Sequence, residues 1–238
     1  MKKAIIIGAT SGIGKELAKI LSNNGYKVGL TGRRKQLLEA IQTGNPQAFE
    51  ILQLDITEID TLSNKLDELV HKLGGMDLLV ISSGTGDFNP MLDFDIEKKT
   101  IDTNVTGFTF VADWTYQYFE KQQSGHLVGI TSLAGIRGNR IAPSYNASKS
   151  YQINYLEGLR QKAGKAKHDI TVTDIRPGFV ATDMAKGDGQ FWVATPEKAA
   201  KQIYAAIRNK KRTAYITKRW GLIAFLLKIL PKRMYEKM

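Results

Sequence analysis

The sequence predicts an α/β fold in which one doubly wound parallel sheet lies between two layers of helices. Short apolar segments alternate with longer amphipathic ones along the 238 residues, as expected for strands joined by helical crossovers. Residues 4–7 and 78–81 are apolar at nearly every position, which indicates strands buried on both faces. A glycine-rich turn follows the first of these strands. Since the chain has no repeat or linker, we expect a single three-layer α/β/α domain.

The alternation also gives the order of the elements. Strands are expected at residues 3–8, 27–31, 48–54, 77–82, 126–132, 170–175 and 213–216. Helices are expected at residues 13–23, 34–43, 58–73, 96–122, 144–163 and 196–208. Thr195 followed by Pro196 is typical of a helix start, with a capping hydroxyl and a proline in the first turn.

The composition is that of an ordinary globular protein, with 42% hydrophobic and 24% charged residues. The absence of cysteine excludes disulfides, thiol nucleophiles and cysteine-ligated metals, and it fits a cytoplasmic protein. His71, His126 and His168 lack the spacing of metal ligands, so no metal site is expected. The apolar run at the N-terminus is too short for a signal peptide.

The net charge of +11 is unevenly distributed. Residues 208–238 contain ten Lys and Arg residues and one acid, Glu236, whereas residues 1–207 contain 24 basic and 22 acidic residues. The positive charge therefore belongs to a C-terminal tail and not to the body. Because no nucleic-acid-binding motif accompanies it, nucleic acid is not expected as a partner.

The turn after the first expected strand suits a dinucleotide phosphate. Glycines there allow a pyrophosphate to approach the backbone, and the following helix N-terminus offers N–H groups and partial positive charge. The spacing G-x-x-x-G-x-G differs from the general G-x-G-x-x-G fingerprint, and a purely structural turn is the alternative. At this position we favour dinucleotide binding. The expected contacts are Gly8, Thr10, Ser11, Gly12, Ile13 and Gly14.

The end of the second expected strand indicates which dinucleotide binds. An acidic residue there would accept hydrogen bonds from the adenosine ribose and favour NAD, but the chain has Gly32 followed by Arg33 and Arg34. Two guanidinium groups suit a 2′-phosphate, which predicts NADP(H) in preference to NAD. The alternative is that both arginines only begin a solvated helix. Asp55 and Ile56, after the third strand, are expected near the adenine.

Ser132, Tyr145 and Lys149 form the candidate catalytic set. A Tyr-x-x-x-Lys pair on a helix places both side chains on one face, about one turn apart. A nearby ammonium favours the phenolate, which lowers the pKa of the phenol from about 10 and makes it a usable acid or base. Ser132 would hold a substrate oxygen beside the phenol. Since such a Tyr–Lys pair also arises by chance on many helices, its weight depends on the other motifs.

The joint pattern resembles the short-chain dehydrogenase/reductase family, whose members have a Rossmann-type fold. The resemblance covers residues 1 to about 210. Each single motif is weak, but their common order and spacing match the family. The motifs are the glycine turn, Asn104, Ser132, Tyr145 with Lys149, and Pro177-Gly178 followed by Thr182.

The resemblance implies a role for each of these residues. Tyr145 would be the general acid in reduction and the base in oxidation, while Lys149 would lower its pKa and hold the nicotinamide ribose. Ser132 would bind and polarise the substrate oxygen. Asn104 would support a proton-relay water at a break in the long fourth helix, and Thr182 would contact the nicotinamide carboxamide beside the Pro-Gly turn. The structural alternatives are a helix-backbone bond for Asn104 and an N-cap for Thr182.

One segment departs from the family pattern. The family usually has Asn-Asn-Ala-Gly after the fourth strand, where this chain has Ile81-Ser82-Ser83-Gly84. Gly84 still allows backbone approach to the cofactor, with Ser83 beside it. The asparagine side-chain hydrogen bonds, which brace the central sheet in the family, must be made by Ser82 and Ser83 or lost.

The resemblance implies an NADP(H)-dependent oxidoreductase that transfers a hydride between nicotinamide and a carbonyl or secondary alcohol. It also implies a homodimer or homotetramer built on the long fourth and fifth helices. Two alternatives stay open: a non-catalytic NADP-binding sensor or scaffold, and an epimerase or dehydratase with the same fold. The intact Ser–Tyr–Lys set argues against the sensor, because a sensor needs no proton donor.

Two further segments bear on the substrate. Residues 1–217 are expected to form the dinucleotide-binding domain, including a substrate loop at 183–195 whose Met184, Phe191 and Trp192 suggest a lid with an apolar inner face. These side chains are equally explained as core or subunit contacts. If they line the pocket, they favour a substrate such as a lipid, steroid or acyl ketone. Residues 218–238 form a basic, apolar tail that would lie on a membrane surface, pack against another subunit or cap the pocket.

Overall fold

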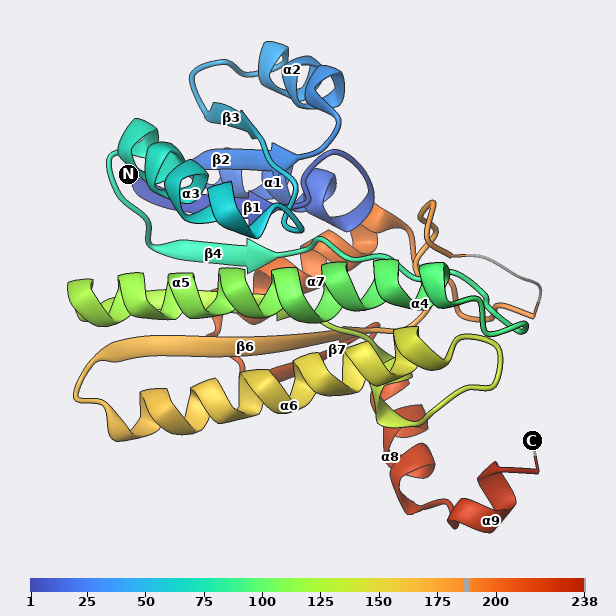
Figure 1. Cartoon of the computed structure of the whole chain (residues 1–238). Coiled ribbons are helices and arrows are strands. Elements are labelled where there is room, and N and C mark those ends of the chain that lie inside the picture. The colour runs from blue at the N-terminus through green and yellow to red at the C-terminus, as the bar shows by residue number, and fades with distance from the viewer. Residues whose placement is uncertain (186–188, 238) are drawn as a thin grey trace.

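The computed structural model of the chain describes residues 1–185 and 189–237. At its centre is a seven-stranded sheet with the order β3-β2-β1-β4-β5-β6-β7, in which all neighbours are parallel (Figure 1). This confirms the predicted fold class, and each expected strand lies within two residues of its observed bounds. The strands are β1 (Lys2–Ile7), β2 (Tyr26–Gly32), β3 (Phe49–Gln53), β4 (Leu78–Ile81), β5 (Ser124–Ile130), β6 (Asp169–Pro177) and β7 (Thr213–Ile216).

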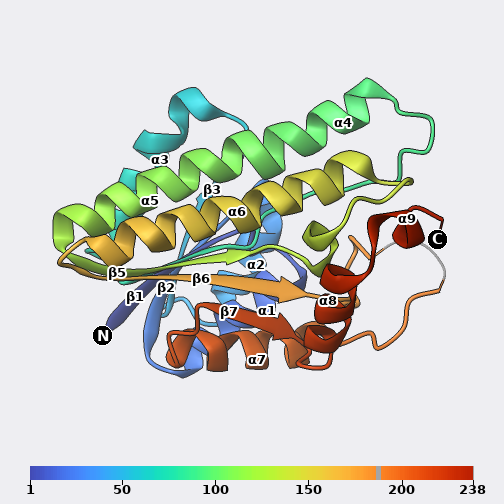
Figure 2. The same cartoon turned by 90° about the horizontal axis from the view of Figure 1, so that it is seen from below.

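Helices cover both faces of the sheet, as Figure 2 shows. One layer contains α1 (Gly12–Asn23), α2 (Lys35–Thr43) and α7 (Pro196–Arg208), and the other contains α3 (Ile59–Leu73), α5 (Phe108–Gln122) and α6 (Pro143–Lys165). The expected start of α7 is confirmed, because the Thr195 hydroxyl accepts a hydrogen bond from the Lys198 N–H at 3.2 Å.

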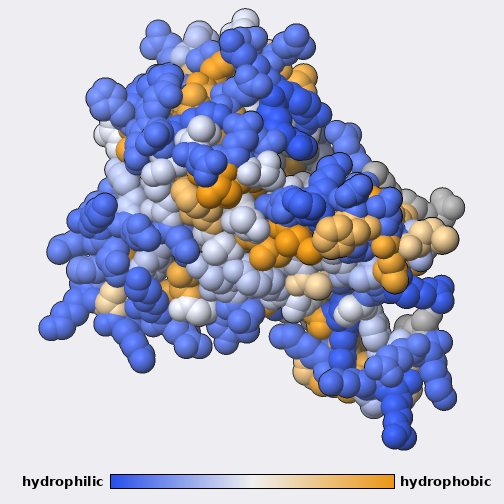
Figure 3. Space-filling view, in the orientation of Figure 1, coloured by the Kyte–Doolittle hydropathy of each residue, from blue (hydrophilic) through white to orange (hydrophobic). Residues whose placement is uncertain are grey.

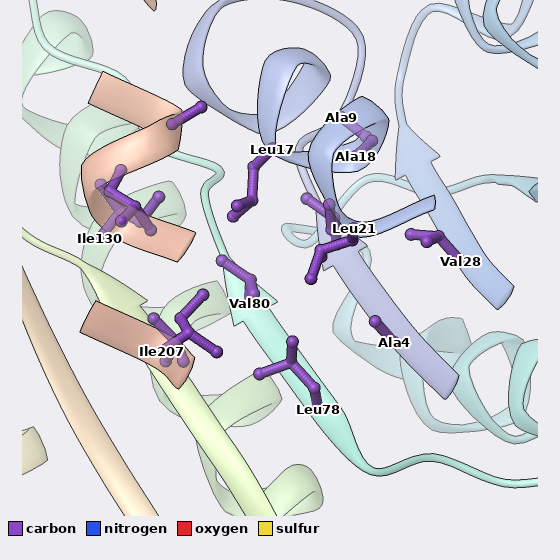
Figure 4. Packing of buried hydrophobic residues seen from close by; sticks show 14 of the residues in the cluster. Ala4, Ala9, Leu17, Ala18, Leu21, Val28, Leu78, Val80, Ile130 and Ile207 are labelled. Atoms are coloured by element: carbon purple, nitrogen blue, oxygen red, sulfur yellow. The ribbon is translucent and has the colours of Figure 1, made fainter. Parts of the chain in front are cut away.

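Successive residues of the central strand face opposite layers. Ala4 and Ile6 pack on the side of α1 and α7, whereas Ile5 and Ile7 pack on the side of α3 and α5. None of the four is more than 1% exposed. Figure 4 shows the first of these two clusters, with Leu17 of α1 among the buried side chains. Since burying one such side chain contributes about 1.5–3 kcal/mol, the strand is fixed from both sides.

The expected long helix at 96–122 is interrupted where the sequence places Asn104. It begins as α4 (Phe94–Ile101), passes through a π-helical segment at Asp102–Gly107, and continues as α5. A π-helical turn inside a longer helix redirects backbone carbonyls from their usual partners and is frequent at functional sites.

The topology opens a crevice at the carboxyl ends of the strands. β1 is hydrogen-bonded to β2 on one side and to β4 on the other, so the strand order reverses at β1. Ligands of doubly wound sheets bind at such a switch point. The C-terminal helices α8 (Trp220–Ile229) and α9 (Lys232–Tyr235), which the sequence did not predict, lie at this same end of the sheet (Figures 1 and 2).

Candidate active site

A cleft of about 930 Å³ lies at the carboxyl ends of the strands and brings most of the predicted site residues together. Gly14 and Asn104 are the two predicted residues that do not line it. The predicted residues in its wall are Gly8, Thr10, Ser11, Gly12, Ile13, Arg33, Arg34, Asp55, Ile56, Ser83, Gly84, Ser132, Tyr145, Lys149, Pro177, Gly178 and Thr182.

The glycine-rich turn forms one end of the cleft. Gly8 has a φ of +90°, and a Cβ at this position would lie 2.6 Å from the Ser83 backbone nitrogen, so only glycine fits. α1 begins at Gly12, and its first N–H groups therefore point towards the turn. Arg34 reaches over the turn, where its Nη2 donates to Thr10 Oγ1 and Ser11 Oγ, both at 2.8 Å.

Ser132 and Tyr145 meet at the other end of the cleft. Ser132 follows β5, caps the short 3-10 helix Leu133–Ile136, and accepts a hydrogen bond from the Ala134 N–H at 3.1 Å. Tyr145 lies in the first turn of α6, and its side chain lines the cleft together with Ser132. The neighbouring Asn146 fixes this arrangement, because its Nδ2 donates to the carbonyls of Ala134 and Arg137 at 2.8 Å each.

The ionisable groups of this set are strongly affected by burial. Burial raises the pKa of Tyr145, and the hydrogen bond from Ser132 opposes this rise without cancelling it. Burial also lowers the pKa of Lys149 to about 8, against the attraction of Asp174. The Lys149 Nζ lies 5.8 Å from the centroid of the Tyr145 ring. The net shift of the phenol pKa is thus opposite to the lowering expected from the lysine, because loss of solvation outweighs the effect of Ser132.

Asn104 and Lys149 are joined by a residue that the sequence did not identify, Gln152. The Gln152 Nε2 donates to the Asn104 main-chain oxygen at 2.8 Å, and its Oε1 accepts from Lys149 Nζ at 2.9 Å. The Gln152 side chain therefore links Lys149 directly to the main-chain oxygen of Asn104, the residue expected to support a relay water. Lys149 Nζ also donates to the Ile130 carbonyl at 3.3 Å. Gln152 lies three residues after Lys149 on α6, so one turn of helix sets the geometry.

The Asn104 side chain holds the loop after β4 and does not bond to its own helix. Its Oδ1 accepts from the Thr85 N–H at 2.9 Å, and its Nδ2 donates to the Thr85 carbonyl at 2.6 Å and to Ser148 Oγ at 3.0 Å. Asn104 is fully buried. Since Thr85 follows Gly84, these bonds position the backbone that lines the centre of the cleft.

Comparison with known proteins agrees with this geometry. Residues 2–191 match the family model described as short chain dehydrogenase. The chain belongs to the short-chain dehydrogenase/reductase family. An uncharacterized oxidoreductase of Myxococcus xanthus is 34% identical over 188 residues, which cover 77% of this chain and 74% of that protein. The family membership makes this chain an oxidoreductase.

Two solved structures show the same fold. A short-chain dehydrogenase from Streptomyces avermitilis has a TM-score of 0.83 at 21% identity and covers 95% of this chain and 91% of its own. ElxO, solved with NADP bound, has a TM-score of 0.78 at 23% identity and covers 90% of this chain and 96% of its own.

This short-chain dehydrogenase has Ile81-Ser82-Ser83-Gly84 where the family usually has Asn-Asn-Ala-Gly. The Ser83 hydroxyl is buried, lines the cleft and has no hydrogen-bond partner among the residues that the structure describes. It does not replace an asparagine brace within the sheet. A buried network beneath the site includes Thr131 Oγ1, which donates to Asp174 Oδ1 at 2.7 Å, and Arg176 Nε, which pairs with Asp174 Oδ2 at 2.7 Å.

The substrate loop at 183–195 divides between the cleft and an aromatic cluster. Met184 lines the cleft beside Thr182, which does not cap a helix. Phe191 and Trp192 instead pack against Trp220 of α8, with ring centroids 5.0 and 5.6 Å away. Residues 186–188 of the expected lid lie outside the described residues.

The C-terminal tail contributes directly to this cleft. Trp220, Leu227 and Tyr235 are among its lining residues. Trp220 is almost fully buried against Gly178, where an added Cβ would lie 2.2 Å from the indole ring. The tail was expected to lie on a membrane surface, to pack against another subunit or to cap the pocket. The inward side of the tail contacts the pocket, as the third possibility states.

Proposed function

We propose that this short-chain dehydrogenase uses NADP(H) to transfer a hydride to a carbonyl or from a secondary alcohol. The substrate that carries this group has a sizeable apolar portion. The observation that carries this proposal is the meeting of Ser132, Tyr145 and Lys149 in the same cleft as the glycine-rich turn. Ser132 supplies a hydrogen-bond donor to the substrate oxygen, Tyr145 supplies a proton, and Lys149 supplies a positive charge.

The residues around β2 support NADP(H) over NAD. A Cβ at Gly32 would lie 2.6 Å from Thr10 Cγ2, so the acidic side chain that would favour NAD would have to displace Thr10. Arg33 and Arg34 both line the cleft beside Gly32, and both are exposed. Arg34 already uses one nitrogen on Thr10 and Ser11, which orients its guanidinium over the turn.

The chain's residues also fit the remainder of a dinucleotide. Among the described residues the buried Ser83 hydroxyl has no hydrogen-bond partner, Asp55 and Ile56 line the cleft after β3, and Thr182 lies beside Gly12 of the glycine-rich turn. When bound, the nicotinamide supplies or accepts the hydride. The Lys149 ammonium is expected to hold the ribose hydroxyls beside it.

In the reducing direction, negative charge grows on the substrate oxygen as its carbon accepts the hydride. The Ser132 hydroxyl donates a hydrogen bond to that oxygen, and Tyr145 transfers its phenolic proton to it, which gives the alcohol. The raised pKa of Tyr145 keeps the phenol protonated at neutral pH, so the proton to be donated is in place before hydride transfer. Asn104 holds the loop after β4 in place, and Gln152 positions Lys149.

The substrate end of the cleft has apolar walls. Ile141, Phe179, Met184 and Leu227 line it, and these residues come from four separate parts of the chain. An apolar substrate such as a lipid, steroid or acyl ketone suits these walls better than a small polar one. We further propose a catalytic domain at residues 1–217 that assembles as a cytoplasmic homodimer or homotetramer through α5 and α6.

The proposal is tested by following NADPH absorbance with ketones and aldehydes graded by chain length. We expect kcat/KM to rise with chain length, since each buried methylene contributes about 0.8 kcal/mol. NADH should support a much lower rate at the same concentration. Equal rates with both cofactors would contradict the NADP assignment, and absence of turnover with every carbonyl would contradict the proposed reaction.

A further inference from the structure

Helix α8 is apolar on two opposite sides, and the chain covers only one of them. Trp220, Ala224 and Leu227 face inward, where the first two are buried and the third lines the cleft. The outward side chains recur at positions i, i+3, i+4 and i+7 and are between 48 and 61% exposed. They are Leu222, Phe225, Leu226 and Ile229. A helix that is apolar all round needs a cover on every side, so the outward face requires a partner.

The charge around this outward face is almost entirely positive. Residues 218–238 contain six basic residues and one acid, Glu236, which gives a net charge of +5. The basic residues are Lys218, Arg219, Lys228, Lys232, Arg233 and Lys237. In Figure 3 the protruding tail is mostly blue, which marks hydrophilic residues, and orange patches of hydrophobic residues lie among them. An apolar stripe flanked by Lys and Arg is typical of a helix that lies in a membrane interface.

We propose that α8 and α9 dock on an anionic lipid surface through the outward apolar face and the basic residues around it. A second copy of this chain is a poorer cover, because a symmetric contact would bring two faces of charge +5 together. An anionic bilayer complements the charge and accepts the apolar side chains at the same time. In the described part of the chain no helix is long and apolar enough to cross a membrane, so the contact is peripheral.

The tail is held firmly enough for its outward face to stay outward. Arg137 Nε donates to the Leu227 carbonyl at 2.8 Å, and its Nη2 donates to the Leu230 carbonyl at 2.5 Å, so one guanidinium caps the end of α8. Tyr235 donates to the Gly138 carbonyl at 2.6 Å. Trp220 anchors the start of the helix between Gly178 and two aromatic side chains of the substrate loop, Phe191 and Trp192.

This anchoring gives docking a consequence for the substrate, which rests on the function proposed above. The same helix that faces the lipid on one side lines the cleft with Leu227 on the other. Docking therefore brings the apolar end of the cleft to the lipid surface. The substrate class that follows is an apolar carbonyl or alcohol held in the bilayer.

The binding test uses the full chain and sedimentation with vesicles, without cofactor or substrate. Wild-type protein should be recovered with strongly anionic vesicles, made of phosphatidylcholine with about 30% phosphatidylglycerol. It should not be recovered with vesicles of phosphatidylcholine alone. Recovery should fall as salt is raised, because screening weakens the charge attraction. Phe225→Asp with Ile229→Asp places acids on the outward face, and recovery should fall at least about tenfold.

Matched controls separate docking from general effects of charge. Lys232→Glu with Arg233→Glu should lower the partition coefficient at least about tenfold. Lys165→Glu with Lys167→Glu makes the same change of charge at two exposed positions, one at the C-terminal end of α6 and one just after it, and it should leave vesicle binding nearly unchanged. Equal recovery of all variants would overturn the proposal. So would absence of wild-type binding to anionic vesicles, or dissociation of an oligomer by Phe225→Asp, which would identify a second copy as the cover.

A second arm tests the link to the substrate. Phe225→Asp with Ile229→Asp should reduce turnover of a long-chain ketone held in anionic vesicles and leave turnover of a soluble short-chain ketone unchanged. Equal turnover of the vesicle-held ketone would overturn the delivery step. If wild-type protein reduces neither ketone, the proposed reaction fails, while the vesicle-binding result still decides the docking.

Discussion

Gln152 provides the sharpest test of how the site is held together. Gln152 is fully buried, and it joins the Asn104 carbonyl to the Lys149 ammonium through bonds of 2.8 and 2.9 Å. Gln152→Leu keeps a similar shape and removes both bonds. Loss of a hydrogen bond to a charged group costs about 1.5–3 kcal/mol, and a buried carbonyl without a donor costs about 1–3 kcal/mol. Because leucine regains some apolar burial, we expect the free energy of unfolding to fall by about 2–4 kcal/mol.

The same substitution should move the titration of Lys149. Its pKa of about 8 reflects burial, and loss of the Gln152 oxygen removes a group that stabilises the charged form. NADPH affinity, measured by fluorescence titration, should fall as pH rises through the lysine pKa, and this fall should occur at lower pH in Gln152→Leu. Gln152→Glu should move it to higher pH, since a carboxylate favours the ammonium. Identical pH profiles in all three proteins would refute the reasoning.

Three further predictions follow from single contacts. Arg34→Ala should weaken NADPH binding about 10- to 100-fold and change NADH binding little, whereas Lys35→Ala, outside the cleft, should change neither when measured by calorimetry. The folded pKa of His126 is about 4, below its unfolded value of 6.5, so the unfolded chain binds the extra proton between these values. Stability should therefore fall by about 3 kcal/mol as pH drops through this window in urea titrations, and less in His126→Gln. Arg137→Met should speed hydrogen exchange in α8 while exchange in β1 stays slow.

The strands and the motif order were predictable because they depend on local pattern. Residues 4–7 are apolar throughout since successive side chains face two different helix layers, and that pattern is visible without the fold. The order of the motifs predicted that Ser132 would lie near Tyr145. The sequence alone does not give the distance between the two side chains. The break near Asn104 was likewise expected, and the structure has a π-helical segment there.

The remaining features depend on contacts between distant segments. Gln152 looks like any glutamine on a helix until the π-helical segment brings the Asn104 carbonyl to it. The sequence gives no sign that the Trp220 ring fills the space above Gly178, because neither residue has a local pattern that indicates the other. The pKa of Tyr145 was expected to fall from its Lys149 neighbour alone. Burial, which depends on the whole fold, decided its direction.

In the proposed reaction Tyr145 gives a proton to the substrate oxygen while hydride is transferred. The most direct measurement compares single-turnover oxidation of bound NADPH by a reactive ketone in wild-type protein and Tyr145→Phe, with NADPH affinity measured in parallel. We expect the rate to fall at least about 100-fold, as for loss of a general acid, while the dissociation constant for NADPH changes less than about threefold. A rate within about threefold of wild type would contradict the assignment. Tight NADPH binding by wild-type protein with no oxidation by any carbonyl would instead indicate a sensor.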